Sequence, residues 1–389
     1  MSSSTIPNSF DDVTDFVVNR GNGITGLVDS GIQKVPERYI LPPQQRFDLT
    51  KVVSQDSILI IDVSNWDDPE VIKSICEASG KWGFFQIINH GIPLQVLENI
   101  TDAAHSFFGL PNEQRSKYYK GASPSETVFL ATSFSPQAEV ALEWRDYLSF
   151  QYIPGNDQAS ALWPPVCKYV IFGIFFFTFC SEEILCNCCY IITIESYWLA
   201  CRDEVLEYMK KAEIVIKNLL QVLLKGLNVK DFDRDTQHTL MGSPRINLNY
   251  YPKCPNPQLT AGVGPHSDIS TITVLLQDDI GGLYVRGIED DTWIHVPPIK
   301  GALVINIGDV LQIISNDKYK SIEHRVVANK IKNRVSVPIF VNPAPDAVFG
   351  PLPESGEIPI YKQLVFSDYF NFYFSKPHDG KKTIDYARI

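Results

Sequence analysis

The chain has 389 residues, of which 44% are hydrophobic and 20% charged, and its formal net charge at pH 7 is -11. This length accommodates one large domain, or two closely packed ones, with a sizeable core. No Lys/Arg-rich block offsets the negative charge, which argues against a nucleic-acid partner and means that an anionic substrate requires a local basic patch.

The terminal sequences contain no recognisable targeting signal. The N-terminus has no basic region followed by an apolar one, and the C-terminus has no targeting or lipid-anchor motif. We therefore expect a cytoplasmic protein with reduced thiols. The eight cysteines are arranged neither as a disulfide framework nor as a zinc site. Five of them fall within residues 169–202, and the chain lacks the second half of a zinc motif.

In chain order, an N-terminal arm of residues 1–56 precedes a region of regular structure at 57–168. The hydrophobic pattern there predicts a strand at 58–64, an amphipathic helix at 68–83, a strand at 84–93 and a second amphipathic helix at 93–111. His90 lies at the end of the second strand, and we interpret it as a structural rather than a catalytic residue.

Residues 169–202 have an unusual composition. A run of 12 apolar residues is followed by Glu182-Glu183 and then by a second apolar run. Each run is too short to cross a bilayer, which requires about 20 apolar residues, and glutamates are costly at its centre. We therefore do not expect a membrane span.

The region at 203–240 contains a long helix, predicted from Asp203 to Val229, because acidic residues open it and Lys225-Gly226 lie near its end. From 241 to 345 the periodicity changes to that of strands, and a C-terminal segment of 346–389 follows. Short runs rich in β-branched and aromatic residues occur at 245–251, 271–276, 282–285, 292–296, 302–308, 310–315, 321–328 and 334–341. Eight such runs predict a mixed α+β fold with a double-stranded β-helix (jelly-roll) core and flanking helices.

A candidate metal site lies within these strands. His266 and Asp268 are two residues apart, so on a strand they would project from the same face. His324 follows after 56 residues on a later strand. Two histidines and one carboxylate are the facial triad of non-haem Fe(II) oxygenases, which leaves coordination positions open for a cosubstrate and O₂.

Arg334 and Ser336 form a second pair with the same spacing, ten residues after His324. A guanidinium fork beside a hydroxyl suits the distal carboxylate of a 2-oxo diacid, because paired N–H donors match the two oxygens of a carboxylate. The order of the two motifs along successive strands therefore predicts a site for Fe(II) and such a cosubstrate inside one barrel.

The residues from Ile58 to the C-terminus, apart from 169–202, resemble the plant 2-oxoglutarate/Fe(II)-dependent dioxygenases. The resemblance is carried by KWGFFQIINHGIP, NLNYYPKCP, HSDISTITVLLQDDIGGLYV, INIGDVLQIISNDKYKSIEHRV and RVSVPIFVNP. Three further segments resemble more specifically the feruloyl-CoA ortho-hydroxylases of coumarin biosynthesis: FVVNRGNGITGLVDSGI, ATSFSPQAEVALEWRDYLSF and KPHDGKKTIDYARI.

The resemblance implies a role for each site residue. It makes His266, Asp268 and His324 the ligands of Fe(II), and it makes Arg334 and Ser336 the group that holds the 5-carboxylate of 2-oxoglutarate. Asn249 and Tyr251 match positions that contact this cosubstrate, whereas Tyr250, on the other face of the strand, is expected to pack. Phe340 corresponds to an aromatic residue that lines the substrate pocket, although an aromatic side chain on a barrel strand is as often part of the core.

The implied activity is 2-oxoglutarate-dependent ortho-hydroxylation of feruloyl-CoA leading to scopoletin, with O₂ as second cosubstrate, succinate and CO₂ as coproducts and ascorbate as reductant in vitro. The implied partner is thus a small molecule, a hydroxycinnamoyl-CoA thioester. One alternative is a related dioxygenase that hydroxylates p-coumaroyl-CoA, scopoletin or a flavonoid. An alternative of another class is a non-catalytic jelly-roll binding protein or an inactive splice product.

The chain departs from the family pattern at residues 169–202, since relatives pass almost directly from the equivalent of Lys168 to that of Asp203. Phe, Ile and Tyr, whose codons are rich in A and T, dominate this stretch. We interpret it as an insert that comes from a retained intron or a gene-model error. The alternative is a genuine membrane-tethering or interaction loop.

Overall fold

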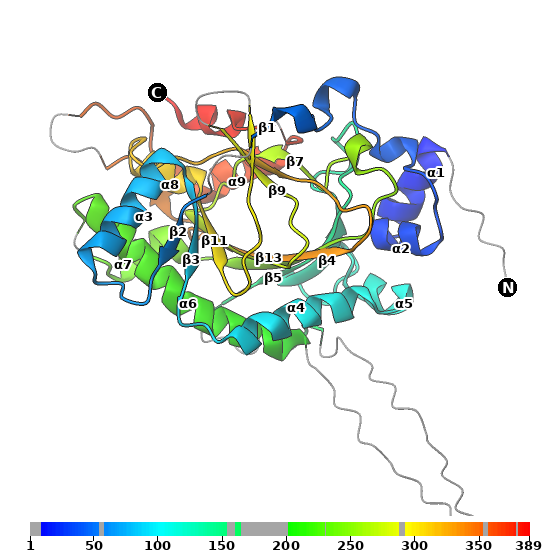
Figure 1. The fold of residues 1–389 in the computed structure, drawn as a ribbon, viewed down its shortest axis with the longest axis horizontal. Coiled ribbons are helices and arrows are strands. Elements are labelled where there is room, and N and C mark those ends of the chain that lie inside the picture. Colours follow the sequence, from blue (N-terminus) through cyan, green and yellow to red (C-terminus); the bar gives the residue numbers. More distant parts are fainter. Residues whose placement is uncertain are drawn as a thin grey trace, which may run out of the picture.

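The computed structural model describes residues 9–53, 58–153, 160–164, 201–229, 231–287, 292–352, 357–378 and 380–389, and Figure 1 shows their arrangement. The helices are α1 Phe10–Thr14, α2 Gly23–Asp29, α3 Pro69–Lys81, α4 Leu94–Phe108, α5 Asn112–Arg115, α6 Cys201–Gly226, α7 Arg234–Met241, α8 Asp309–Ile314 and α9 Phe366–Phe374. The strands are β1 Val52–Val53, β2 Ile60–Asp62, β3 Phe84–Ile88, β4 Val128–Thr132, β5 Asp146–Gln151, β6 Arg245–Tyr251, β7 Val263–His266, β8 Ile272–Gln277, β9 Leu283–Arg286, β10 Trp293–His295, β11 Leu303–Ile307, β12 His324–Val326, β13 Arg334–Val341, β14 Val348–Phe349 and β15 Leu364–Val365.

Two sheets form the centre of the molecule. The larger has eight strands in the order β2-β3-β11-β8-β13-β6-β5-β4, and the smaller has five in the order β1-β10-β9-β12-β7. Strands that are consecutive in sequence alternate between the sheets from β6 to β13, apart from the β9–β10 hairpin, as expected when a jelly roll is wound from one chain. The predicted α+β class with a jelly-roll core is confirmed.

The two faces of the larger sheet bury different kinds of side chain. Along β13, Val335, Val337 and Ile339 belong to the apolar cluster shared with the helices. The alternate residues of that strand face the smaller sheet and are Arg334, Ser336, Pro338 and Phe340. Because successive side chains on a strand point to opposite faces, a single strand supplies both the core beneath the sheet and the polar wall above it.

Helices α3, α4 and α6 cover the outer face of the larger sheet, and α4 and α6 run side by side beneath it in Figure 1. The described part of α6 contributes buried residues at the helical spacing Val205, Tyr208, Met209, Ala212, Val215 and Ile216. This spacing gives one apolar stripe. The predicted long helix is confirmed, although it runs from Cys201 to Gly226 rather than from Asp203 to Val229, and it packs on α3 and α4.

One predicted strand is wrong. Residues 310–315 lie mainly in α8, a helix from Asp309 to Ile314 in which every residue is buried. A short run in which every residue is buried has no solvent-facing side, so periodicity alone does not distinguish a buried strand from a buried helix. The sequence analysis also did not predict strands β4 and β5, which extend the larger sheet beyond the barrel.

The described part of the N-terminal arm is held by a polar contact to the larger sheet. The buried carboxylate of Asp146 accepts hydrogen bonds from the backbone N–H groups of Ile24 (3.0 Å) and Thr25 (2.8 Å) at the start of α2. Val13, Ile24 and Trp144 lie in the apolar cluster around this contact. Within the described residues, no helix is both long and apolar enough to cross a membrane.

Candidate metal centre

Three predicted metal ligands lie together on the smaller sheet and its margin. His266 ends β7, His324 begins β12, and the two are directly paired in the ladder. Asp268 lies in the loop after β7, so the expectation that one strand carries both His266 and Asp268 is wrong in this detail. One candidate ligand atom from each of the three residues lies within 4.8 Å of the others.

Backbone carbonyls orient the two imidazoles. Nδ1 of His266 lies 2.9 Å from the carbonyl oxygen of Gly264, and Nδ1 of His324 lies 3.3 Å from that of Ile322. With Nδ1 protonated and donating, the free lone pair is on Nε2 of each ring. These Nε2 atoms lie 3.5 and 3.8 Å from Oδ1 of Asp268, so all three lone pairs converge.

Two hydrogen bonds orient the second carboxylate oxygen of Asp268. Its Oδ2 accepts hydrogen bonds from Thr273 Oγ1 (2.6 Å) and Asn306 Nδ2 (2.8 Å). Burial opposes ionisation of this carboxyl, but His324, His266 and Thr273 outweigh burial and hold its pKa well below the ordinary range. Asp268 is therefore an oriented carboxylate with one oxygen available for a metal.

Burial, and the neighbouring His266, lower the pKa of His324 to about 4. The imidazole is then neutral at physiological pH, which is the form that binds a metal ion. Two imidazole nitrogens and one anionic oxygen on one side of a cavity fit a divalent iron with open positions.

The pocket that contains these three residues lies between the two sheets. All eight predicted site residues line it: Asn249, Tyr251, His266, Asp268, His324, Arg334, Ser336 and Phe340. The pairing of β13 with β6 explains the juxtaposition, because Arg334 lies opposite Tyr251 and Ser336 lies opposite Asn249. Directly opposed residues in an antiparallel ladder present their side chains on the same face.

Arg334 is a buried cation with unused hydrogen-bonding capacity. Its side chain donates from Nη1 to Ser336 Oγ at 3.1 Å, and its guanidinium carbon lies 4.9 Å from the centre of the Tyr251 ring. Its buried Nε has no hydrogen-bond partner, nor has the buried Oδ1 of Asn249. Among the described residues no carboxylate forms an ion pair with Arg334, so an anionic ligand is the missing partner that this donor set fits.

The structure adds residues that the sequence analysis missed. Asn306 and Thr273, which hold Asp268, are polar residues inside apolar strands, and that contrast is a signal that could have indicated them. Arg145 also lines the pocket, and it forms a buried ion pair of 2.7 Å with Glu143. His378, from the C-terminal segment, stacks on His266 with a distance of 4.5 Å between ring centres. No local sequence pattern indicates His378.

Two predicted non-catalytic residues lie outside this pocket. His90 contacts the carbonyl oxygen of Gly301 through Nε2 at 2.9 Å, and the Ile92 N–H donates to its Nδ1 at 3.2 Å. Tyr250 stacks on Phe108, with ring centres 4.8 Å apart and an angle of 7° between the planes. Both residues therefore have the structural roles that were predicted.

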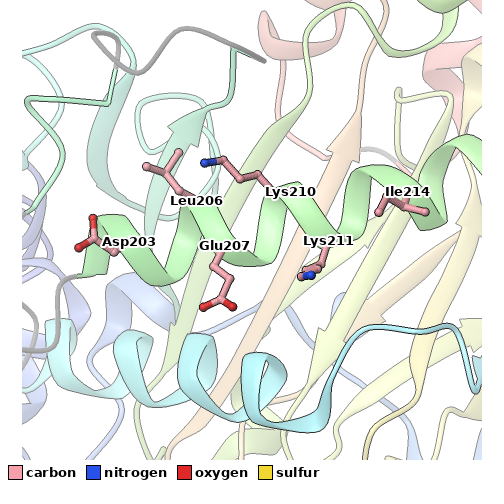
Figure 2. Close-up of a pocket in the computed structure, with 6 residues that line it drawn as sticks. All are labelled: Asp203, Leu206, Glu207, Lys210, Lys211 and Ile214. Atoms are coloured by element: carbon pink, nitrogen blue, oxygen red, sulfur yellow. The ribbon is translucent and has the colours of Figure 1, made fainter.

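A second hollow lies on the surface of α6 and shares no lining residue with the jelly-roll pocket. Figure 2 shows its described lining residues, which share one face of the helix: Asp203, Leu206, Glu207, Lys210, Lys211 and Ile214. Their charges are of both signs, and Ile214 is exposed. None of the three candidate metal ligands belongs to this hollow, so we assign no function to it.

The insert predicted at 169–202 lies almost wholly outside the described residues, which resume at Cys201. The described residues before and after this gap lie next to each other. Pro164 and Arg202 are joined by a backbone hydrogen bond of 3.2 Å.

Comparison with known protein families gives two matches. Residues 243–343 match the model of the 2OG-Fe(II) oxygenase superfamily. Residues 58–166 match the model described as non-haem dioxygenase in morphine synthesis N-terminal. The first match covers the strands that carry the candidate ligands, and the second covers β2, α3, β3, α4, β4 and β5.

Among characterised proteins, the chain is similar over nearly its whole length to acyl-CoA hydroxylases. It is 52% identical over 381 residues to a feruloyl CoA ortho-hydroxylase of Ipomoea batatas, covering 97% of each chain. It is 51% identical to a bi-functional coumaroyl CoA and feruloyl CoA ortho-hydroxylase of the same organism, covering 100% of both. A bi-functional enzyme of Ruta graveolens is 50% identical, over 98% of this chain and 95% of the relative.

Solved structures show the same architecture. The structure of JOX2 in complex with 2OG, Fe and JA superposes with a TM-score of 0.75 at 30% identity, covering 94% of this chain and 97% of that one. The rice dioxygenase for auxin oxidation superposes with a TM-score of 0.62 at 18% identity, covering 86% of this chain and 100% of that one. The second comparison supports the fold alone.

Proposed function

The chain belongs to the 2OG-Fe(II) oxygenase superfamily, and from this membership we propose that it hydroxylates feruloyl-CoA at the ring position ortho to the propenoyl side chain. The enzyme is a dioxygenase that uses Fe(II), 2-oxoglutarate and O₂. One oxygen atom enters the substrate and the other enters succinate, and the carbon lost from 2-oxoglutarate leaves as CO₂. Isomerisation of the product's side chain and lactonisation with loss of CoA would then give scopoletin.

The proposed iron ligands are Nε2 of His266, Oδ1 of Asp268 and Nε2 of His324. This assignment is supported by the convergence of their lone pairs and by the hydrogen bonds that occupy the remaining polar atoms of the three side chains. Iron bound there supplies the redox chemistry and the activation of O₂. The protein supplies the oriented ligands and the pocket around them.

The proposed role of Arg334 and Ser336 is to bind the 5-carboxylate of 2-oxoglutarate. The support is a buried guanidinium with an unpaired Nε and no ion-paired carboxylate among the described residues. Asn249 and Tyr251 lie directly across the ladder and are proposed to contact the same cosubstrate. Phe340, four residues further along β13, lines the pocket and is proposed to contact the aromatic ring of the substrate.

A second candidate substrate has a specific observation in its favour. Relatives in two plants, each about as similar to the chain as the monofunctional one, act on both coumaroyl CoA and feruloyl CoA. We therefore propose p-coumaroyl-CoA as an alternative substrate of the same pocket. We further propose that the enzyme acts in the cytoplasm.

The test is an activity assay of the purified chain with Fe(II), ascorbate, 2-oxoglutarate and O₂. Feruloyl-CoA, p-coumaroyl-CoA, scopoletin and a flavonoid are supplied separately. We expect feruloyl-CoA to be hydroxylated, with succinate formed in equal amount. Succinate formation that no thioester stimulates, or a preference for scopoletin or the flavonoid, would contradict the proposed substrate.

A further inference from the structure

The pocket face of the larger sheet continues beyond the metal centre onto β6, β5 and β4. Phe340 at the end of β13 lies opposite Arg245, the first residue of β6. Asn247, two residues along β6, lies opposite Ser149 of β5, and Ser149 lies opposite Phe129 of β4. Since opposed residues share a face, these side chains form a strip that leads away from Asn249 and the cosubstrate pocket.

Arg245 is the cation at the outer end of this strip. It donates from Nη1 to Ser149 Oγ at 2.9 Å. It forms no ion pair with a carboxylate in the described part of the chain, whereas Arg145, at the inner end, is neutralised by Glu143 at 2.7 Å. Burial without an acidic partner lowers the pKa of Arg245. A guanidinium in this situation favours an external anion.

Lys120 adds a second positive charge at the same place. Its Nζ lies 5.7 Å from the centre of the Phe129 ring, and the guanidinium carbon of Arg245 lies 5.4 Å from the same centre. Lys120 is exposed. The strip therefore ends in a pair of cations around one aromatic ring, on a chain whose formal net charge is -11. This pair is the local basic patch that an anionic substrate requires.

The middle of the strip is polar. The Oδ1 atom of Asn247 is buried and has no hydrogen-bond partner. It lies between Asn249, at the cosubstrate pocket, and Arg245. Asn249 and Arg245 are four positions apart on β6, which corresponds to about 13 Å along the strand. An elongated ligand with an amide N–H in its middle and a negative charge at its far end matches this sequence of groups.

We propose that Arg245 and Lys120 bind the phosphate groups of the substrate's CoA moiety, with the pantetheine arm lying along β6 past Asn247 and the acyl group at the metal centre. This inference rests on the proposed function and extends it, because it identifies the residues that distinguish a CoA thioester from a simple phenolic acid ester. The guanidinium fork matches phosphate oxygens, and the lysine contributes a point charge at the exposed rim.

The experiment compares two thioesters of ferulic acid in the full-length enzyme. Feruloyl-CoA carries the phosphates, and feruloyl-N-acetylcysteamine lacks them but keeps the acyl group and an amide. The measured quantity is the ratio of kcat/KM for the first substrate to kcat/KM for the second. We expect this ratio to fall by about tenfold in Arg245→Gln, the loss typical of a charge-assisted contact, through an increase in KM for feruloyl-CoA.

Two further variants separate phosphate binding from an effect on folding. Lys120→Glu changes an exposed side chain and should also lower the ratio by about tenfold, because it replaces attraction by repulsion. Lys117→Gln, an exposed lysine one turn earlier, is the matched control and should leave the ratio unchanged. Calorimetric titration with CoA alone gives an independent readout, and binding should weaken in Arg245→Gln and Lys120→Glu but not in the control.

An unchanged ratio in both Arg245→Gln and Lys120→Glu would overturn the inference while leaving the proposed function intact, provided that the wild-type enzyme hydroxylates feruloyl-CoA. A wild-type enzyme without any preference for feruloyl-CoA over the truncated thioester would also overturn it. Failure of the wild-type enzyme to hydroxylate either thioester would overturn the inference and the proposed function together.

Discussion

The backbone N–H of Arg202 donates a hydrogen bond of 3.2 Å to the carbonyl oxygen of Pro164. The described fold therefore stops at Pro164 and resumes next to it, in the first turn of α6. Four residues, 165–168, precede the proposed insert at 169–202, and a connection of this length spans such a gap easily. This relationship supports the proposal that the dioxygenase fold closes without the insert.

Deletion of residues 169–202, which joins Lys168 to Asp203, should raise the yield of soluble protein and preserve hydroxylation. The physical reason is that the apolar runs of this stretch promote association, whereas helix α6 loses only its first two described residues. Both proteins are expressed in parallel and assayed at equal soluble concentration. An inactive or insoluble deletion variant beside an active full-length protein would show that the stretch is an integral part of the fold.

Removal of any one proposed metal ligand should abolish turnover. His266→Ala, Asp268→Ala and His324→Ala each leave two anchors instead of three, so we expect loss of bound iron, and activity more than about 100-fold lower. Iron content and 2-oxoglutarate consumption are measured together. Ser267→Ala is the matched control, because the Ser267 hydroxyl points away to Asp309 at 3.3 Å. A ligand variant that retains iron and activity would remove that residue from the triad.

Replacement of Arg334 by lysine should weaken cosubstrate binding although the charge is kept. An ammonium group does not reproduce the planar fork, so we expect KM for 2-oxoglutarate to rise about tenfold or more while iron affinity is retained. Arg20→Lys, at an exposed arginine paired with Asp15, serves as the control. An unchanged KM for 2-oxoglutarate would mean that its 5-carboxylate is bound elsewhere.

Substitution of His378 should loosen the iron site without removing a ligand. Its ring stacks on His266 with an interplanar angle of 8°, and its Nδ1 lies 3.0 Å from Glu143 Oε1. We expect His378→Ala to weaken Fe(II) binding about tenfold, an effect typical of the groups that orient metal ligands. His378→Phe keeps the aromatic contact and should weaken binding less. Equal iron affinity in all three proteins would show that stacking on His266 is not needed.

The ion pair between Glu143 and Arg145 should make stability depend on pH. Burial opposes ionisation of Glu143, but Arg145 and His378 lower its pKa from the ordinary 4.5 to about 2. A folded-state pKa below the unfolded one means that the stabilisation is present above pH 4.5 and is lost as the pH falls towards 2. Urea denaturation between pH 3 and pH 7 should show this loss, and Glu143→Gln should reduce the slope.

At pH 7, Glu143→Gln should also lower the free energy of unfolding by about 3–5 kcal/mol, because it leaves a buried guanidinium without its carboxylate. Asp385→Asn is the control. Its partner Arg388 is exposed, so removal of this surface pair should cost about 0–1 kcal/mol. Equal losses in the two variants would show that the buried pair does not stabilise the fold.

Local sequence was sufficient to predict which side chains enter the pocket where these side chains share one face of a strand. The spacing of two between Arg334 and Ser336 predicted that both project into one pocket, and the pairing with Tyr251 and Asn249 agrees. The same reasoning failed for Asp268, which reaches the metal centre from a loop. It failed also for 310–315, because a fully buried run lacks the solvent-facing side that distinguishes an amphipathic helix from a strand.

The sequence by itself indicated the jelly-roll class, the three candidate ligands and the candidate carboxylate-binding pair, because the period of each strand-like run and the residue types at short spacings are local properties of the chain. Only the tertiary structure brought Glu143 to His378, 235 residues away, and placed Arg245 opposite Phe340 at the end of the pocket face. The physical reason is that side-chain direction is set by the local backbone, whereas the pairing of distant strands is set by how the whole chain buries its apolar faces.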